Sequence, residues 1–541
     1  MQRILIAALA FITLPTLARA QTPAASPAPA AAASPAAAST PDATPAPSAM
    51  TPAAATPPMS PPTPAATQPP GDEGNLPAWP GNLPAPQISL TTLELMHRKG
   101  LITDAEYAEA LHDLAELGMR AKNENTLVVG RFATTMYGFA QADFIHDSTQ
   151  SFLDLPGMGA IARPGTPAGE LGRTMFSVRN SRIGFRIAAP EMNGIRSSGL
   201  LEMDFYGNQP SSPPKSAGYA ESSFFTSPAF RVRHMLLKAD TDIVNVWVGQ
   251  TWGLVGWGGG FQPASMLSQG VPGELYARNP QLRIDKPVKA GPVTVEAAVA
   301  ALRPPQMDSG VPDFQGGIKL SINDYKGVQS VGQTGTAISP AALAVSGGIR
   351  HFRLTDPETN PALQGVNGHI IAADVLVPII PAKTRQPWAL TFLGEAAWSS
   401  GYADQYTSLN GGAGVGAPKG ISSTDYAKLA DVDGMVGWSS VTHQLSTVDW
   451  RTLLVSAQLY LPPSGKLWLS GTYSNAYSDN IGEFGSSKAV FGQEIWWDAM
   501  VVADVTDSTR FGLEYDNYTE DYGDKVQGKN SRVMLTGLFI F

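Results

Sequence analysis

The 541-residue chain contains no cysteine, so its fold relies on neither disulfide bonds nor thiolate metal sites. After the first twenty residues, no stretch approaches the roughly 18 consecutive apolar residues that a membrane-spanning helix needs. A membrane-embedded form of the protein therefore has to cross with strands that close into a barrel. Basic residues are fewer than acidic ones, 37 against 46, and the formal net charge of −9 argues against nucleic acid as a partner.

Catalytic and metal-binding motifs are also missing. The chain has neither a Gly-x-Ser-x-Gly elbow nor a His-Glu-x-x-His pair, and its seven histidines are scattered. We therefore expect no enzymatic activity, no cofactor and no resident metal. A catalytic dyad formed across strands of a barrel stays open as an alternative. So does Ca²⁺ bound in surface loops by the acidic groups Asp431-Val-Asp433-Gly434 and Glu520-Asp521 with Asp524.

The first 85 residues have the pattern of an exported, tethered protein. Arg3, the apolar run Ile4–Leu14 and Ala18-Arg-Ala20 predict a signal peptide over residues 1–20. Residues 21–85 are dominated by Pro, Ala, Ser and Thr, a composition that cannot bury a core and favours polyproline II. We expect a disordered tether that extends to about 150–200 Å. It is either a simple spacer or a segment that contacts peptidoglycan.

Residues 86–124 are predicted to form a short helical segment on the periplasmic side. Thr103 and Glu106 have the spacing of a capping box, and Gly100 and Gly118 are stop signals. Neither helix is long enough to be stable alone in water. Two arrangements remain open: a bundle formed with other copies of the chain, which we prefer, and a hairpin within one chain.

The rest of the chain, residues 125–541, predicts a transmembrane β-barrel. Segments of about ten residues alternate apolar and polar side chains. On one strand, for example, Leu453, Val455 and Leu459 share a face opposite Thr452 and Gln458. Sixteen antiparallel strands are predicted, at 128–145, 174–189, 198–207, 229–240, 243–252, 279–289, 293–303, 314–323, 342–354, 367–379, 387–400, 450–462, 466–478, 491–504, 510–522 and 530–541.

The connections between these segments alternate between short and long, as they do in outer-membrane barrels. Tight turns are expected at 240–242, 289–292, 462–465 and 506–509, and long connections at 146–173, 208–228, 253–278 and 401–449. Residues 324–341 are longer than a periplasmic turn should be, which leaves a strand count that differs by two as an alternative. The last strand ends on Phe541, an aromatic residue expected to be paired at the point of barrel closure.

A β-sandwich gives similar alternation and is the alternative fold. Against it, the strands are long, and many aromatic residues lie near predicted strand ends. Interfacial girdles use such residues because one part of each ring is apolar and the other tolerates water. The residues expected in girdles are Trp247, Trp252, Trp398, Trp468, Trp496, Trp497, Tyr402 and Tyr515.

Four short motifs carry a resemblance to a known family. They are Met136-Tyr-Gly-Phe-Ala-Gln-Ala-Asp143, Ser181-Arg-Ile-Gly-Phe-Arg186, Arg231-Val-Arg-His234 and Val248-Gly-Gln-Thr-Trp252. Over about residues 89–541 the chain resembles the DcaP-like outer-membrane porins. This resemblance implies a homotrimeric sixteen-stranded channel in the outer-membrane lipid of Gram-negative bacteria, with an N-terminal helical segment, and uptake of dicarboxylates and related small anions. The tether has no counterpart in the resemblance.

Charge is distributed unevenly along the predicted barrel. Residues 173–303 hold fourteen basic against nine acidic side chains, a net of +5, whereas residues 355–541 hold eleven against twenty, a net of −9. A charge that faces lipid is costly, so charges at membrane depth should point into the lumen. The expected pore-lining residues are the basic Arg182, Arg186, Arg231, Arg233, Arg278 and Arg283 and the acidic Glu395, Glu494, Asp498, Glu514 and Asp516.

These two arcs predict a transverse field and a ladder of guanidinium groups that favours small anions such as dicarboxylates. The alternative is that the arcs neutralise each other and only keep the pore wet. The pattern around Arg231 and Arg233 conflicts with an inward position for both, because strict alternation places them on the same face as Met235 and Leu237. The glycine-rich connection 253–263 is a candidate for a loop that folds into the channel, since glycine lets backbone approach a wall closely.

Overall fold

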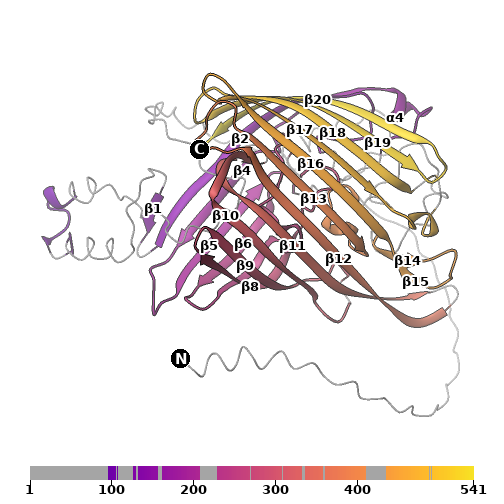
Figure 1. Ribbon diagram of the computed structural model, residues 1–541, viewed down its shortest axis with the longest axis horizontal. Helices are drawn as coiled ribbons and strands as arrows, with labels where there is room; N and C mark the ends of the chain where they lie inside the picture. Colours follow the sequence, from indigo (N-terminus) through magenta and orange to yellow (C-terminus); the bar gives the residue numbers. More distant parts are fainter. Residues whose placement is uncertain are drawn as a thin grey trace, which may run out of the picture. The chain divides into compact units, whose positions relative to one another are not determined.

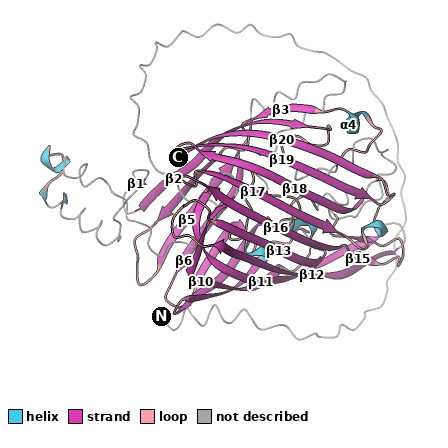
Figure 2. Cartoon of the chain, turned by 45° about the horizontal axis from the view of Figure 1, so that its top comes forward, coloured by secondary structure: helices cyan, strands magenta, loops and turns pink. Residues whose placement is uncertain are grey.

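Sixteen antiparallel strands of this protein close into one barrel in the computed structural model (Figures 1 and 2). The structure describes residues 96–104, 106–107, 126–129, 132–155, 161–207, 228–267, 270–306, 309–331, 335–356, 360–409, 434–485, 488 and 490–541. Closure is made by β20 (Gln527–Ile540), which pairs with β2 (Phe132–Asp147) from Phe139↔Ile540 to Asp147↔Arg532. A closed order of hydrogen-bonded strands excludes the sandwich.

The wall of the barrel follows chain order. The second position is shared by two short strands, β3 (Arg173–Ser177) and β4 (Arg182–Ala188), which both pair with β2. The other wall strands are β5 (Arg196–Asp204), β6 (Arg231–Asp240), β7 (Asn245–Trp252), β8 (Arg278–Ala290), β9 (Val293–Leu302), β10 (Asp313–Val331), β11 (Gly335–Asp356), β12 (Asn360–Ile380), β13 (Leu390–Ser400), β16 (Asp449–Leu461), β17 (Leu467–Tyr477), β18 (Phe491–Asp504) and β19 (Thr509–Tyr522).

The described chain also contains shorter strands and helical turns. A short strand β1 (Thr126–Val129) pairs with the start of β2, and β14 (Val436–Trp438) pairs with β15 (Leu445–Thr447). The helical turns are α4 (Pro167–Glu170), η1 (Val255–Trp257), η2 (Ala403–Gln405) and η4 (Ile481–Glu483). No helix in the described part of the chain is long and apolar enough to cross a membrane.

The predicted tight turns lie at one end of the barrel, and the predicted long connections 146–173, 208–228, 253–278 and 401–449 leave and rejoin the wall at the other. We call these the turn end and the loop end. The predicted turns are present: Thr241 N–H donates to Val244 O at 3.1 Å, and Gly465 N–H donates to Leu461 O at 2.8 Å. Phe541 exchanges two backbone hydrogen bonds of 2.9 Å with Gly138, so the last residue is paired in the wall (Figure 1).

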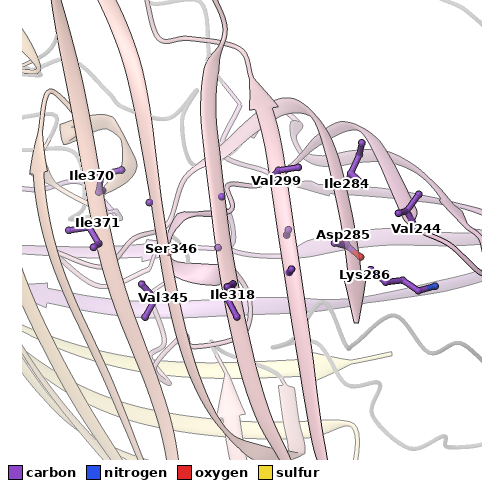
Figure 3. Close-up of a pocket in the computed structure, with 15 residues that line it drawn as sticks. Val244, Ile284, Asp285, Lys286, Val299, Ile318, Val345, Ser346, Ile370 and Ile371 are labelled. Atoms are coloured by element: carbon purple, nitrogen blue, oxygen red, sulfur yellow. The ribbon is translucent and has the colours of Figure 1, made fainter. Parts of the chain in front are cut away.

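The outer face of the barrel is apolar because side chains alternate in and out along each strand. On β16, Leu453 is 49% exposed whereas its neighbours Thr452 and Leu454 are buried. A shallow groove of about 720 Å³ is lined by residues of strands β8 to β12, among them Ile318 and Ile371, which Figure 3 labels. Its floor includes Gly316, which is paired with Gly347.

Five of the eight expected girdle residues are not on the outer face. Trp398, Trp497 and Tyr515 are exposed there, as predicted. The other five are buried, which makes their assignment wrong: Trp247, Trp252, Trp468, Trp496 and Tyr402. The four tryptophans occupy inward positions of their strands, and Trp468 donates its Nε1–H to Asp504 Oδ2 at 3.2 Å. Strand alternation, and not nearness to a strand end, decides which way an aromatic side chain points.

The N-terminal predictions lie largely outside the described residues. This holds for the signal peptide (1–20), the tether (21–85) and most of the helical segment (86–124). Residues 96–98 have helical backbone, and Gly100 has a φ of +65°. The capping box is present, since Thr103 N–H donates to Glu106 Oε2 at 2.8 Å and Glu106 N–H donates to Thr103 Oγ1 at 3.3 Å. The helices that these signals predict stay predictions.

Candidate functional site

The interior of the barrel is the candidate site, because polar and charged side chains gather on the inward face of the strands. On β4, β5 and β6 three arginines meet two carboxylates. Arg233 Nε lies 2.6 Å from Glu202 Oε1, and Arg182 Nε lies 3.5 Å from the same oxygen. Arg231 binds Asp204 through two hydrogen bonds of 2.6 and 2.9 Å, and Arg233 Nη1 lies 3.3 Å from Asp204 Oδ2. Three guanidinium groups thus share two carboxylates.

A β-bulge explains how Arg231 and Arg233 reach the interior. The register between β5 and β6 shifts opposite Glu202–Met203, which leaves Arg233 without a cross-strand partner. Beyond the bulge the alternation is reversed, so Met235 and Leu237 point outward and are each 56% exposed, whereas Arg233 is 1% exposed. The arginines and the apolar residues therefore face opposite sides, although they share sequence parity.

The remaining predicted basic residues have different surroundings. Arg283 on β8 is ion-paired, with Nη2 at 3.3 Å from Glu296 Oε1 and Nε at 3.4 Å from Asp285 Oδ2. Arg186 stacks on the Tyr137 ring at 4.1 Å. Arg278 lies against two aromatic rings, Trp252 at 5.0 Å and Tyr276 at 5.7 Å. Among the described residues, no carboxylate forms an ion pair with Arg186 or Arg278.

The predicted acidic residues are also brought together on the inward face, where they hold loops in place. Glu514 on β19 accepts from Ser265 Oγ at 2.8 Å and from Met266 N–H at 2.5 Å. Glu395 on β13 accepts from Leu275 N–H at 2.9 Å, and Glu494 on β18 accepts from Ser408 Oγ. These three carboxylates, together with Asp498 and Asp516, are 0–4% exposed. Three of them therefore serve as anchor points for loop segments.

Carboxylates also stand directly opposite one another across the strands. The register pairs Asp374 with Glu395, Asp498 with Asp516, and Glu494 with Glu520. Both carboxylate oxygens of Asp374 and of Asp516 are buried without a hydrogen-bond donor. Two ionised carboxylates at such positions destabilise a strand pair, and this side of the barrel concentrates closely spaced carboxyl groups. The described residues contain no group of three or more side chains suited to hold a metal ion.

The described residues of the connection between β7 and β8, 253–267 and 270–277, lie in the interior, as predicted for the glycine-rich start. Leu254 and Val255 donate their N–H groups to Gln315 Oε1 on β10 at 2.8 and 3.1 Å. Gly256 N–H donates to Ser346 Oγ on β11 at 3.0 Å. Gly256 has a φ of +76°, and a Cβ there would lie 2.7 Å from Leu275 Cβ, so glycine is required. We call residues 253–267 and 270–277 the inner loop.

The inner loop then reaches the opposite wall and returns. Met266 O accepts from Gln141 Nε2 on β2 and from Asn180 Nδ2, at 3.4 and 3.0 Å. Pro272 O accepts from Ser474 Oγ on β17 at 2.6 Å. Apart from the anchors on Glu514 and Glu395, Glu274 accepts from Val271 N–H at 2.8 Å within the loop, and its burial raises the pKa of Glu274 to about 8.

Sequence reasoning missed the carboxylates that neutralise the arginines. Glu202 and Asp204 alternate with apolar residues along the predicted strand 198–207, and that alternation was the available signal. Asp374 was missed in the same way. The buried His234 was not assigned a role: its Nδ1 lies 3.1 Å from Thr251 Oγ1, and its ring meets the edge of Trp252 at 5.3 Å.

Solved structures of outer-membrane proteins match the chain. The outer membrane channel DcaP of Acinetobacter baumannii matches with a TM-score of 0.55 at 15% identity, over 76% of this chain and 99% of that one. An OmpT loop-deletion mutant of Vibrio cholerae and an anion-selective porin from Comamonas acidovorans each match with a TM-score of 0.42, at 11% and 9% identity. Each match covers 76% of this chain and 100% of the other. These two scores are too low to carry an argument.

No family model and no curated protein sequence matches the chain. At 15% identity, the match to DcaP establishes the fold and nothing finer. The resemblance that the four short motifs predicted is confirmed at this level. The chain has the sixteen-stranded porin-like fold of the outer-membrane channel DcaP.

Proposed function

We propose that this protein is an outer-membrane porin through which small solutes diffuse passively, with a preference for small anions such as dicarboxylates. The closed barrel with an apolar outside and a charged inside supports a channel in outer-membrane lipid. A sixteen-stranded barrel is wide enough to leave an aqueous passage. In this proposal the turn end faces the periplasm and the loop end faces outward.

The balance of charge on the arc from β4 to β8 carries the anion preference. Arg182, Arg231 and Arg233 share only Glu202 and Asp204. Arg186 and Arg278 add two more guanidinium groups, neither of which is ion-paired with a carboxylate among the described residues, although Asp204 attracts Arg278 from farther away. Among these residues, five cationic groups stand against two anionic groups, while Arg283 on β8 is balanced by its pairs with Asp285 and Glu296. An arginine fork binds carboxylates through paired, exchangeable hydrogen bonds.

The acidic arc has a different part in this proposal from the one that the sequence predicted. Glu395, Glu494 and Glu514 were expected to line the pore, whereas their oxygens accept hydrogen bonds from loop segments. The inner loop covers two of them. We therefore infer that solutes respond to the arginine arc more than to the acidic arc, and that Asp498 and Asp516 lie behind the loop.

Electrical recordings on the purified protein in a planar bilayer test the proposal. Porin-sized conductance steps are expected, and the reversal potential in a KCl gradient should indicate chloride preference. The double variant Arg182→Ala/Arg233→Ala should lose part of that preference. A folded, heat-modifiable barrel without conductance would exclude a porin, whereas cation preference in the wild-type protein would exclude the arginine arc.

The alternative is a barrel with a hydrolase or a structural, cell-wall-anchoring role. His234 is the histidine most enclosed by the interior, but its hydrogen-bond partner is Thr251 and no serine hydroxyl. This observation does not favour a hydrolase. Contact of the tether 21–85 with peptidoglycan is compatible with either role, and pull-down of the mature protein by purified cell wall, with and without residues 21–85, tests it.

We propose that the protein is a homotrimer whose N-terminal helical segment clamps three copies together. Met96 and Leu101, which are 37% and 68% exposed in the single chain, provide apolar surface that a bundle would cover. Native mass spectrometry after deletion of residues 89–120 tests the clamp. A trimer that persists unchanged would assign trimerisation to the barrel.

A further inference from the structure

The turn end of the barrel carries a second internal element, formed by the ends of β10 and β11. β10 pairs with β9 only as far as Ile322, and β11 pairs with β12 only from Ala342. Residues 326–331 and 335–340 continue beyond the wall as partners of each other, from Lys326↔Pro340 to Val331↔Gly335. We call these two legs the inner hairpin. They account for residues 324–341, which were too long for a turn.

The inner hairpin is folded into the barrel. Wall strands alternate between buried and exposed side chains, but residues 328–331 are buried in succession, each at 0–1% exposure. A strand with both faces buried must be covered on both sides. The register break between Ile322 and Lys326 leaves three extra residues on β10 at the point where the chain leaves the wall. Such an irregularity lets a strand bend.

Polar contacts fix the first leg to β13 and β16. The Gln458 side chain pairs with the backbone of Ser330, accepting from its N–H and donating to its O, both at 2.7 Å. The hydroxyl groups of Ser330 and Tyr460 lie 2.9 Å apart, and Thr391 Oγ1 donates to Val328 O at 2.6 Å. Gln458 thus satisfies a strand backbone as a neighbouring strand would.

Two arginines fix the second leg. Thr336 Oγ1 accepts from Arg385 Nη2 at 2.8 Å and from Arg510 Nη2 at 3.0 Å. Both arginines are ion-paired with Asp504, at 2.8 Å and 2.5 Å. Arg385 comes from the connection between β12 and β13 and Arg510 from β19, so the hairpin is attached to widely separated parts of the wall.

Close packing completes the attachment. A Cβ on Gly327 would lie 2.6 Å from Pro378 Cβ and 2.9 Å from Thr391 Oγ1, so no larger side chain fits without displacement. Inside the barrel, Gln329 Nε2 donates to Gln262 O of the inner loop at 3.4 Å. An element from the turn end and an element from the loop end therefore meet in the interior.

From this meeting we propose that the inner hairpin is a second constriction of the channel, which limits passage on the turn-end side together with the inner loop. The inference rests on the porin function proposed above. The hairpin occupies the interior on the side of β13, β16 and β19, so the permeation path is confined to the side of the arginine arc. Solutes would then pass Arg186 and Arg278 at close range.

Replacement of residues 327–339 by Asn-Gly tests this proposal, because Lys326 and Pro340 are paired and that dipeptide favours a two-residue hairpin turn. The wall pairings of β10 and β11 end outside the deleted segment. In planar bilayers the single-channel conductance should rise by roughly twofold or more, since the narrowest section limits ion flow. Gln458→Leu should give an intermediate rise.

Two glycine substitutions serve as controls for the deletion of the inner hairpin. Gly482→Ala adds a Cβ where no atom lies within 4 Å and should leave conductance unchanged, whereas Gly327→Ala should raise it. A heat-modifiable deletion variant with wild-type conductance would overturn the proposal. If the deletion variant fails to insert, unchanged conductance in Gly327→Ala overturns it instead. A wild-type protein without any conductance refutes the porin function itself, which separates the two failures.

Discussion

Arg233 and Glu202 form a buried ion pair of 2.6 Å inside the barrel, and this pair depends on a β-bulge that displaces Arg233 from the ladder. Glu202 Oε2 also accepts a hydrogen bond from the Tyr137 hydroxyl group at 2.9 Å, and Glu202 Oε1 lies 3.5 Å from Arg182 Nε. One carboxylate thus compensates two guanidinium groups. Removal of the Glu202 charge therefore tests two separate contributions of this cluster, one to the stability of the barrel and one to the charge of the channel.

We predict that Glu202→Gln destabilises the barrel and strengthens anion preference. Removal of one partner from a buried ion pair costs about 3–5 kcal/mol, and the uncompensated arginines raise the positive potential of the arc. Urea unfolding and the reversal potential in a KCl gradient measure the two effects. Glu191→Gln is the matched control, because Glu191 is half exposed and 3.8 Å from Arg196. Weaker anion preference in Glu202→Gln would contradict the charge argument.

Arg278→Ala should reduce anion preference more than Arg231→Ala. Arg278 lies between aromatic rings with no carboxylate pair among the described residues, whereas Asp204 compensates Arg231 directly. We expect a roughly twofold fall in the chloride-to-potassium permeability ratio for Arg278→Ala and a smaller change for Arg231→Ala. Equal effects of the two substitutions would show that local pairing does not determine which arginine solutes meet.

The barrel itself was predictable from the sequence, because the period-two alternation is a local property. Each of the sixteen predicted strands overlaps a wall strand, and the predicted strand 491–504 coincides with β18. Two predicted strands are divided, since 128–145 covers β1 and β2 and 174–189 covers β3 and β4. Breaks of this kind depend on which neighbour a residue pairs with, and a single sequence does not contain that information.

The site was predictable only in part. The inward position of Arg231 and Arg233 required a bulge, and no residue type marks a bulge at that point. The anchoring role of Glu395 and Glu514 required the path of the inner loop, which is set by contacts distant in sequence. Alternation assigns a side chain to a face, but only the tertiary structure shows whether that face meets water, a loop or another charge.

Asp374→Asn should stabilise the barrel. Asp374 stands directly opposite Glu395, and neither of its oxygens accepts a hydrogen bond from an N–H or hydroxyl group of the described residues. Removal of one of two opposed like charges should gain about 0.2–1 kcal/mol. The temperature at which the barrel loses its heat-modifiable form measures the gain. Asp479→Asn is a suitable comparison, since that carboxylate is half exposed and ion-paired with Arg451; a destabilised Asp374→Asn would point to an unseen partner.

Glu274 should make the inner loop sensitive to alkaline pH. Its burial raises its pKa from the ordinary 4.5 of a glutamate to about 8, so the folded loop favours the neutral carboxyl group. The stability that this group contributes is complete below about pH 4.5 and is lost as the pH rises through 8, because the ionised carboxylate is penalised in the folded state. The nearby titratable group is Glu395, which accepts from Leu275 N–H, and negative charges on both carboxyl groups would repel each other.

Single-channel recordings at several pH values test this titration. We expect the open-channel current of the wild-type protein to become noisier as the pH is raised from about 6 to about 9, with a midpoint near the pKa of about 8. The noise should rise because ionisation of Glu274 loosens the inner loop. In Glu274→Gln the neutral side chain keeps its size and the noise should be independent of pH, while Glu170→Gln, on the surface turn α4, should behave as wild type. A pH response that survives in Glu274→Gln would assign the titration to another group of the interior.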